Sequence, residues 1–543
     1  MLRGVNPFRS GPLIALIVVS LLFIIVGLGL RAMYAPEWQH LDPANKTAAF
    51  RPWAVEADCY SQLARDQRIL NGQGLIQNHI AVENWPEGLI PSTTATFDYA
   101  ILLLYFPLKL LTPYPLDWAG AIVSPILWLG LVLFWLFFRS REFTILGRAL
   151  FVIGSAMLPV LVWGTAFGRP RHQSLILALM AIALTAEYER WNVSLIPKRA
   201  WNIFAGVIWG LACWTSLFEP VLVITLLVIF NLVVRRKESP AFLISYGCTM
   251  LLALALEGYH VFNISSLSDE TYAALLRWLG TIAEVRGIGL ETFIGQMTML
   301  SFVAVVPFIS WGLLRRKGDR RADLLLVILT GVLFLFALFQ LRWMKYANLA
   351  ELFLIVRFCQ VDPLRWSRLL VMGFFSLALI YDNGLQIQAR AYAPPNQPSP
   401  ELAKLAKSID APGGIMAPWW ISPGLLYFSG QPIVGGSSHC GISGIVDSAK
   451  FYTATSWVEA EKILQQRKVR WIVVMDDKEF VYPVLNAERN ILGLPLYTEE
   501  AKGDAEQTVW QILVNNRFVP TFLRLRAVTP GLRLYEFQSY SDK

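Results

Sequence analysis

The stretch from Glu56 to Gly88, EADCYSQLARDQRILNGQGLIQNHIAVENWPEG, concentrates polar side chains that could do chemistry. It follows the first long apolar segment and is more polar than almost anything before residue 390. Asp58 lies near its start, and carboxylate oxygens are the ligands that a hard divalent cation prefers. An acidic loop beside a membrane face is therefore our first candidate for a site. The alternative is a solvated aspartate at a helix end.

A second candidate is the segment FGRPRHQSL (167–175), where Arg171 stands next to His172. A neutral histidine ring could ligate a transition metal. Arg169 and Arg171 would repel such a cation, but they could hold a phosphate. The alternative is a turn that is stabilised by contacts with lipid headgroups.

Two further short segments carry charge close to apolar runs. Glu219, in SLFEP (216–220), is an acidic residue at membrane depth, where ionisable groups are usually functional, although a glutamate at a helix end is also common. Arg342 and Lys345 lie in QLRWMKY (340–346), and a guanidinium suits bidentate bonding to phosphate. The alternative for this pair is an interfacial anchor beside Trp343.

The composition of the 543 residues indicates a membrane protein of many spans. Hydrophobic residues make up 55% of the chain and charged residues only 16%, and the mean hydropathy is positive. The net charge is +8, but the basic residues gather in short loops between apolar runs. We therefore interpret the positive excess as a topology signal and not as a nucleic-acid surface.

About eleven apolar runs are long enough to be membrane spans. They are 12–30, 118–138, 148–167, 174–188, 201–217, 221–234, 241–258, 293–314, 324–341, 346–361 and 369–385. The first run follows the basic residues Arg3 and Arg9 and is interpreted as a retained helix with its N-terminus in the cytoplasm.

The loops between these runs agree with one topology. The five loops that should be cytoplasmic are rich in Lys and Arg: 139–148, 189–199, 235–239, 315–321 and 362–368. This agreement requires that the apolar segment Asp98–Leu111 does not cross and is interfacial or re-entrant. The external segments then include the loops 31–117 and 259–292, and all five histidines are external.

The composition changes after Gln386 and predicts a separate domain. A Pro-rich linker (391–400) is followed by a helical pattern (401–408) and by strand-like runs at 469–476 and 531–538. We expect a transmembrane domain over 1–386 and an external α/β domain over 387–543, which is a normal domain size.

Four short motifs in this order resemble the catalytic subunit of oligosaccharyltransferase, a GT-C superfamily glycosyltransferase. They are EADCY (56–60), WPEG (85–88), TIAEVRG (281–287) and PWWISPG (418–424). The resemblance implies a GT-C-like helical fold in which Asp58 and Glu284 bind Mg²⁺ or Mn²⁺ and orient the acceptor. It also implies that Trp419 and Trp420 bind the acceptor, and that Arg342 and Lys345 bind the phosphate of the lipid-linked donor.

The chain departs from the family pattern in three places, which marks a divergent bacterial member. Ile421 stands where the family has the aspartate that reads the acceptor hydroxyl. The segment FGRPRHQSL replaces a second acidic motif, so that His172 and Glu219 become candidate metal ligands and Arg171 a candidate phosphate ligand. The spans between Gln173 and Tyr259 number four, which is two fewer than usual.

The predicted function is that of a metal-dependent, inverting glycosyltransferase in a bacterial inner membrane. It would move a glycan from a polyprenyl-phosphate or -pyrophosphate carrier to a protein asparagine, or to an envelope glycan or lipid, at the periplasmic face. The alternative is a non-catalytic protein that binds lipid-linked sugar in a polysaccharide assembly or export complex. A transporter is disfavoured by the large external domain. The expected partners are the lipid-linked donor, the acceptor and the bilayer, and not nucleic acid.

Overall fold

Contacts along the chain divide it into two compact units, one helical and one mixed. The structure, a computed structural model, describes residues 11–39, 50–91, 93–137, 143–191, 198–258, 269–315, 320–361, 364–392, 399–475, 481–497 and 507–538. The helical unit comprises Met1–Pro36, Ile122–Val261 and Glu284–Ala393. The mixed unit comprises Glu37–Ala121, Phe262–Ala283 and Pro394–Lys543. The predicted division near residue 387 lies close to one of these boundaries, but the mixed unit also takes in two earlier segments.

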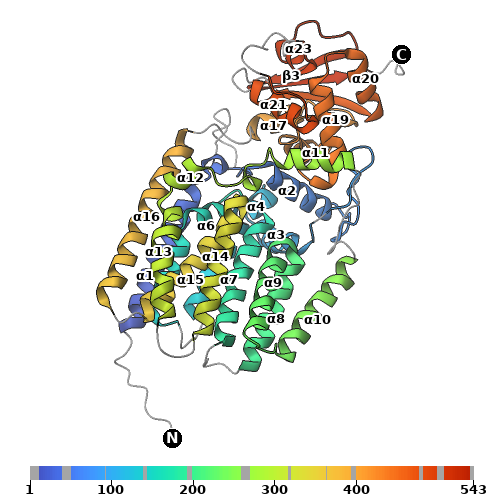
Figure 1. Ribbon diagram of the computed structural model, residues 1–543. Helices are drawn as coiled ribbons and strands as arrows, with labels where there is room; N and C mark the ends of the chain where they lie inside the picture. The colour runs from blue at the N-terminus through green and yellow to red at the C-terminus, as the bar shows by residue number, and fades with distance from the viewer. Residues whose placement is uncertain are drawn as a thin grey trace. The chain divides into compact units, whose positions relative to one another are not determined.

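Helices running side by side form the helical unit (Figure 1). Its helices are α1 (Gly11–Met33), α5 (Ile145–Met157), α6 (Pro159–Gly164), α7 (His172–Trp191), α8 (Lys198–Thr215), α9 (Phe218–Val233), α10 (Pro240–Glu257), α12 (Leu290–Gly295), α13 (Met297–Leu314), α14 (Arg321–Phe339), α15 (Met344–Val361) and α16 (Arg365–Tyr392). The helix α4 (Pro115–Phe137) begins in the mixed unit and continues into this one.

Every predicted apolar run coincides with at least one helix. Six helices in the described part of the chain are long and apolar enough to cross a membrane, namely those at Ile14–Met33, Pro115–Phe137, Pro240–Glu257, Met297–Leu314, Arg321–Phe339 and Arg365–Arg390. The run 148–167 is broken into α5 and α6, because Pro159 starts a new helix. The predicted fold class, a polytopic helical membrane protein with a small C-terminal sheet domain, is confirmed.

The helix α15 lies at the centre of the helical unit. It packs against α5, α13, α14 and α16, and its residues from Met344 to Val356 are all buried. A helix that is buried all round must bond its polar groups internally. Accordingly, Glu351 accepts hydrogen bonds from Ser301 Oγ and from Asn348 Nδ2, the second at 3.0 Å.

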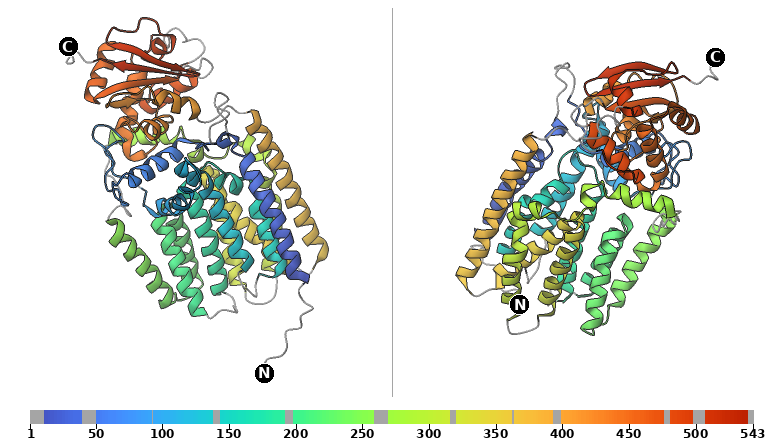
Figure 2. Two further views of the ribbon diagram at one scale, coloured as in Figure 1. Left: turned by 180° about the vertical axis from the view of Figure 1, so that it is seen from behind. Right: turned by 45° about the horizontal axis from the view of Figure 1, so that its top comes forward.

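A four-stranded sheet with surrounding helices forms the core of the mixed unit (Figure 2). The strands β1 (Gly414–Met416), β2 (Val469–Met475), β3 (Leu523–Thr529) and β4 (Leu532–Phe537) lie in the order β1-β2-β4-β3. Of the three strand pairs in this sheet, β1–β2 is parallel, and β2–β4 and β3–β4 are antiparallel. The strand-like runs predicted at 469–476 and 531–538 match β2 and β4, whereas β1 and β3 were not predicted.

The helices of the mixed unit come from three separate parts of the chain. They are α2 (Ala57–Leu70), α3 (Thr96–Leu108), α11 (Asp269–Leu279), α17 (Ser399–Ala406), α18 (Ser422–Ser429), α19 (Ile442–Thr453), α20 (Trp457–Gln466), α21 (Val481–Leu492) and α23 (Val509–Asn515). The helix α3 lies in the segment Asp98–Leu111, which we predicted not to cross the membrane. Its 13 residues would span about 20 Å, less than the hydrocarbon core of a bilayer.

Parts of both predicted external loops are built into the mixed unit. Ile433 N donates to Val82 O at 2.8 Å, and Ile433 O accepts from Trp85 N at 3.0 Å. In the later loop, Arg277 Nε of α11 donates to Ile491 O at 2.9 Å. These segments therefore belong to the structure of the mixed unit and are not simple connections between spans.

Glu488, on α21, is a buried carboxyl for which we predict a pH-dependent stability. It is fully buried, and neither carboxylate oxygen has a hydrogen-bond partner among the described residues. Burial raises its pKa from 4.5 to about 8. Between these two pH values the unfolded chain binds fewer protons than the folded one. The free energy of unfolding should therefore fall as the pH rises from about 4.5 to about 8, by on the order of a few kcal/mol.

Thermal unfolding of wild type and Glu488→Gln as a function of pH tests this prediction. The glutamine variant should lose the slope between pH 4.5 and 8 and should unfold at a higher temperature than wild type at pH 8. Glu459→Gln is the control, because Glu459 lies exposed on the neighbouring helix α20. Equal slopes for Glu488→Gln and wild type would contradict the prediction.

Candidate functional site

Several predicted site residues of the helical unit lie together although they are far apart in the sequence. Arg171 precedes α7, whose first residue is His172, and Glu219 is in the first turn of α9. Glu284 lies in a short 3-10 turn (Ala283–Val285), and Arg342 lies in another (Leu341–Trp343) just before α15. Four cationic side chains meet here, and we call them the basic cluster: Arg169, Arg171, Arg342 and Lys345.

Two carboxylates neutralise part of the basic cluster. Arg171 Nη1 lies 2.8 Å from Glu284 Oε1, and Arg169 Nη2 lies 3.8 Å from the same oxygen. Arg342 Nη2 lies 2.6 Å from Glu219 Oε1. Among these side chains four are positive and two are negative, and burial lowers the pKa of the His172 ring to about 4, which keeps it neutral at physiological pH.

The positive charges act strongly on Glu284. Burial alone would raise the pKa of its carboxyl, but the charges of the basic cluster hold that pKa well below its usual range. The Glu284 side chain nevertheless remains 32% exposed. It is thus a fully ionised carboxylate that sits at the open side of a group of cations.

Aromatic side chains hold the arginines in place. The Arg169 guanidinium lies 3.8 Å from the ring centroid of Trp163 and donates to Trp163 O at 2.7 Å. Arg390, from the last turn of α16, lies 3.8 Å from the same ring. Arg342 lies over the ring of Phe218 at 4.9 Å. Cation–π contacts of this kind fix the position of a guanidinium.

Lys345 is positioned by its neighbours on α7. Its Nζ donates to Gln173 Oε1 at 2.6 Å, so that one of its three donors is used. Neither Gln173 as a ligand of Lys345 nor Trp163 as a platform for Arg169 and Arg390 was predicted from the sequence. The spacing of Arg169, Arg171 and Gln173 was visible, but no pattern in the sequence connects Trp163 with Arg390.

Among the described residues of the helical unit, Glu219 and Glu284 are paired with arginines and are not arranged as a metal site. In the described part of the chain, no three His, Cys, Asp or Glu residues are placed to hold a metal together. Glu219 and Glu284 both bond to arginines, whose positive charges would repel a cation. The predicted ligands His172, Glu219 and Glu284 therefore lie near one another, but in surroundings that suit an anion.

Asp58 belongs to the mixed unit, where it lies exposed in the first turn of α2. An aspartate there is favoured by the helix dipole alone, which was the alternative explanation from the sequence. The role of Asp58 as a ligand or catalytic group stays a prediction.

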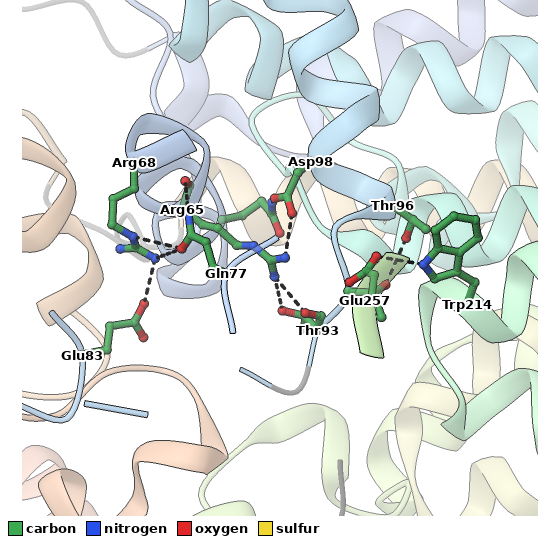
Figure 3. A network of polar contacts seen from close by, with 11 residues as sticks. Arg65, Arg68, Gln77, Glu83, Thr93, Thr96, Asp98, Trp214 and Glu257 are labelled. Carbon is green, nitrogen blue, oxygen red and sulfur yellow. Dashed lines mark hydrogen bonds and ion pairs between the residues drawn. The ribbon is translucent and has the colours of Figure 1, made fainter. Parts of the chain in front are cut away.

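Other polar residues of the first-loop stretch serve the structure (Figure 3). Arg65 Nη2 lies 2.9 Å from Asp98 Oδ2, and Arg65 Nη1 donates to Thr93 O at 2.9 Å. Arg68 donates to Gln77 Oε1 at 3.1 Å and lies 3.9 Å from Glu83. All five charged or amide side chains in this network are buried, so the network fixes α2 and α3 and is not a surface for substrate.

The Trp-Trp pair is half-buried at the end of β1. Trp419 packs edge-on against Trp278 of α11, with centroids 5.5 Å apart, and against Trp420 at 5.6 Å. Trp420 Nε1 lies 3.2 Å from Met475 Sδ. Ile421, which follows, is fully buried. A carboxylate at this position would be enclosed in the core, which explains why an aliphatic residue stands there.

Comparison with solved structures places this architecture among known folds. The oligosaccharyltransferase of Archaeoglobus fulgidus in complex with Zn and sulfate is 14% identical, with a TM-score of 0.60 over 90% of this chain and 70% of that one. AglB of the same organism, with an inhibitory peptide and a dolichol-phosphate, gives a TM-score of 0.58 at 15% identity, over 87% of this chain and 70% of that one.

ArnT from Cupriavidus metallidurans matches at nearly full length. In the apo state it has a TM-score of 0.54 at 12% identity, over 97% of this chain and 98% of that one. Bound to undecaprenyl phosphate it has a TM-score of 0.51 at 11% identity with the same coverage. No family model and no curated protein matches the sequence. The resemblance to oligosaccharyltransferase is thus confirmed at the level of the fold.

Proposed function

We propose that this protein is a membrane glycosyltransferase whose sugar donor is carried on a polyprenyl phosphate or pyrophosphate. The observation that carries the proposal is the basic cluster, in which four cationic side chains from separate helices and turns gather around two carboxylates, an arrangement that suits an anion. The shared fold supports it, since the AglB structure contains a dolichol-phosphate and one ArnT structure contains undecaprenyl phosphate. A lipid-borne phosphate matches both the charge and the location.

The basic cluster would stabilise the leaving group. When the bond from the sugar to the phosphate breaks, negative charge develops on the phosphate oxygen. Arg342 can donate two parallel hydrogen bonds to that phosphate, and Lys345 adds a compact positive charge. Fixed cations in a partly dehydrated site stabilise such charge better than water does. We propose a single displacement with inversion at the anomeric carbon, in which these side chains bind the departing phosphate.

The acceptor side is assigned to Asp58 and Glu284, which would orient the nucleophile, with Trp419 and Trp420 binding the acceptor. Ile421 offers no carboxylate. No hydrogen-bond acceptor therefore stands at this position to recognise the Ser or Thr hydroxyl of a protein substrate. We therefore favour an envelope glycan or lipid over a protein asparagine. The site would face the periplasm of a bacterial inner membrane, with the N-terminus in the cytoplasm.

A divalent ion such as Mg²⁺ or Mn²⁺ would supply electrostatic stabilisation of the donor if Asp58 held it in the complete site. The surroundings of Glu219 and Glu284 do not favour such an ion, and the cations of the basic cluster already provide this stabilisation. Addition of chelator to the purified enzyme distinguishes the two sources of positive charge.

Sugar transfer by the purified full-length protein in lipid nanodiscs tests the proposal. With a polyprenyl-phosphate-linked sugar as donor, we expect transfer by wild type and a loss of about 10² to 10³-fold in kcat for Asp58→Ala. Glu459→Ala is the matched control, because it removes an exposed acidic side chain from the first turn of another helix. Equal rates for Asp58→Ala and wild type would remove Asp58 from the mechanism.

The alternative is a protein that binds lipid-linked sugar without transferring it. Replacement of the second acidic motif by the basic segment 167–175 favours this reading. Tight binding of the donor without turnover on any acceptor would support it.

A further inference from the structure

Glu284 stands where an anionic ligand of the basic cluster would be expected. Its Oε1 atom accepts from Arg171 Nη1 at 2.8 Å and lies 3.8 Å from Arg169 Nη2. A carboxylate and a phosphate offer a guanidinium the same pair of oxygen acceptors. A carboxylate brings one negative charge, as does the phosphodiester of a polyprenyl-phosphate sugar, whereas a polyprenyl-pyrophosphate sugar brings two.

The two carboxylates of the cluster differ in how firmly they are held. Glu219 is 1% exposed in its side chain, pairs with Arg342 at 2.6 Å and accepts from Ser216 Oγ at 3.3 Å. Glu284 is 32% exposed in its side chain and lies in a turn of three residues. A ligand that enters from solvent or from the lipid headgroups would therefore displace Glu284 and leave Glu219 in place.

The backbone that follows Glu284 is anchored to the segment that carries Arg342. Leu341 N donates to Arg286 O at 2.8 Å, and Ile288 N donates to Leu338 O at 3.2 Å. Between these bonds, a Cβ atom on Gly287 would lie 2.7 Å from Leu338 O, so only glycine allows this close approach. The Glu284 side chain can consequently leave Arg171 while its chain remains attached beside Arg342.

We infer that the Glu284 carboxylate occupies the phosphate position of the ligand-free protein and that the lipid-borne phosphate of the donor displaces it from Arg171. This inference rests on the proposed function. Once displaced, the carboxylate lies beside the bound donor and can then contact the acceptor. Glu284 thus competes with other anions for Arg171 when no donor is present, and the donor binds before the acceptor.

Direct binding measurements test the displacement. Full-length protein in neutral-lipid nanodiscs is titrated with undecaprenyl phosphate, and the Kd is measured by microscale thermophoresis. Loss of the competing carboxylate in Glu284→Gln should tighten binding by about tenfold. Glu284→Asp, which keeps the charge on a shorter side chain, should lie between the two. Glu291→Gln is the control, because it removes an exposed charge from the nearby helix α12.

A double-mutant cycle shows whether Glu284 acts through Arg171. The gain on Glu284→Gln should disappear in the Arg171→Ala background, because the carboxylate then has little to compete for. Titration with inorganic phosphate, and with nanodiscs that contain phosphatidylglycerol, separates recognition of a polyprenyl phosphate from binding of free phosphate or of ordinary headgroups.

Each result decides between the proposals. Unchanged or weaker binding by Glu284→Gln, with intact binding by wild type, would overturn the displacement and leave the proposed function standing. Tighter binding of only inorganic phosphate or phosphatidylglycerol would overturn the donor as the displacing ligand. Failure of wild type and every variant to bind any of these phosphates would overturn the proposed function together with the displacement.

Discussion

Arg342→Ala is expected to weaken binding of a polyprenyl-phosphate donor by about 10² to 10³-fold. The substitution removes the guanidinium that would bind the phosphate. It also leaves Glu219, whose side chain is 1% exposed, as a buried carboxylate without its arginine, and this negative charge repels the donor. Both effects act in the same direction. Titration of the full-length protein with undecaprenyl phosphate measures the Kd, and sugar transfer measures kcat/KM.

Two further variants separate the loss of phosphate binding by Arg342 from the effect of the unpaired Glu219 carboxylate. Arg342→Lys keeps the positive charge but loses the two parallel donors, so we expect a loss of only about tenfold. Arg342→Ala combined with Glu219→Gln removes the buried charge and should recover stability while donor binding remains weak. Wild-type affinity in Arg342→Ala would remove Arg342 from the donor site.

Asp98→Ala is expected to destabilise the mixed unit by about 3 to 5 kcal/mol. Asp98 is fully buried and pairs with Arg65, whose side chain is only 5% exposed. Removal of the carboxylate takes away the charge that pairs directly with a buried guanidinium, and the bonds from Arg65 to Thr93 do not replace it. Thermal unfolding of the full-length protein, together with the rate of limited proteolysis, measures the loss.

The same unit offers a matched exposed pair as the control. Arg526 Nη2 lies 2.7 Å from Asp410 Oδ2, but the Asp410 side chain is 59% exposed. Exposed ion pairs contribute at most about 1 kcal/mol, because water and salt screen them. Asp410→Ala should therefore unfold almost at the wild-type temperature. Equal losses for Asp98→Ala and Asp410→Ala would show that burial of the first pair does not matter.

The membrane spans could be predicted because their physical requirement is local. A bilayer demands a long run of apolar residues, and each run can be recognised without knowing its neighbours. The break in the run 148–167 was missed, although Pro159 marks it, because hydropathy does not register backbone geometry. The strands β1 and β3 were missed for a related reason: β1 has three residues, and β3 carries three half-buried or exposed basic and polar positions that do not alternate cleanly.

The candidate site could be predicted only in part. Residue type showed that Arg171, Arg342 and Glu284 bear the right charges, and the topology that we predict from the sequence would put them on one side of the membrane. The sequence could not show that Glu284 bonds to Arg171, since 113 residues separate them. Conversely, the stretch from Glu56 to Gly88 looked functional throughout, yet Arg65 and Arg68 are buried structural residues there. A polar side chain in a loop does not reveal from sequence alone whether it is exposed.

The composite construction of the mixed unit has a consequence for anyone who wishes to handle its C-terminal half in isolation. Asn84 Oδ1 accepts from Ser443 Oγ and from Gly444 N, both at 2.8 Å. Trp278 packs against Ile442, Ile445 and Ile491. A recombinant fragment that starts at residue 394 lacks both Asn84 and Trp278. It therefore exposes apolar surface that is covered in the full-length protein. Residues 79–91 and 269–279 can be supplied as co-expressed peptides or fused through short linkers. They restore the hydrogen bonds of Asn84 and the apolar contacts of Trp278.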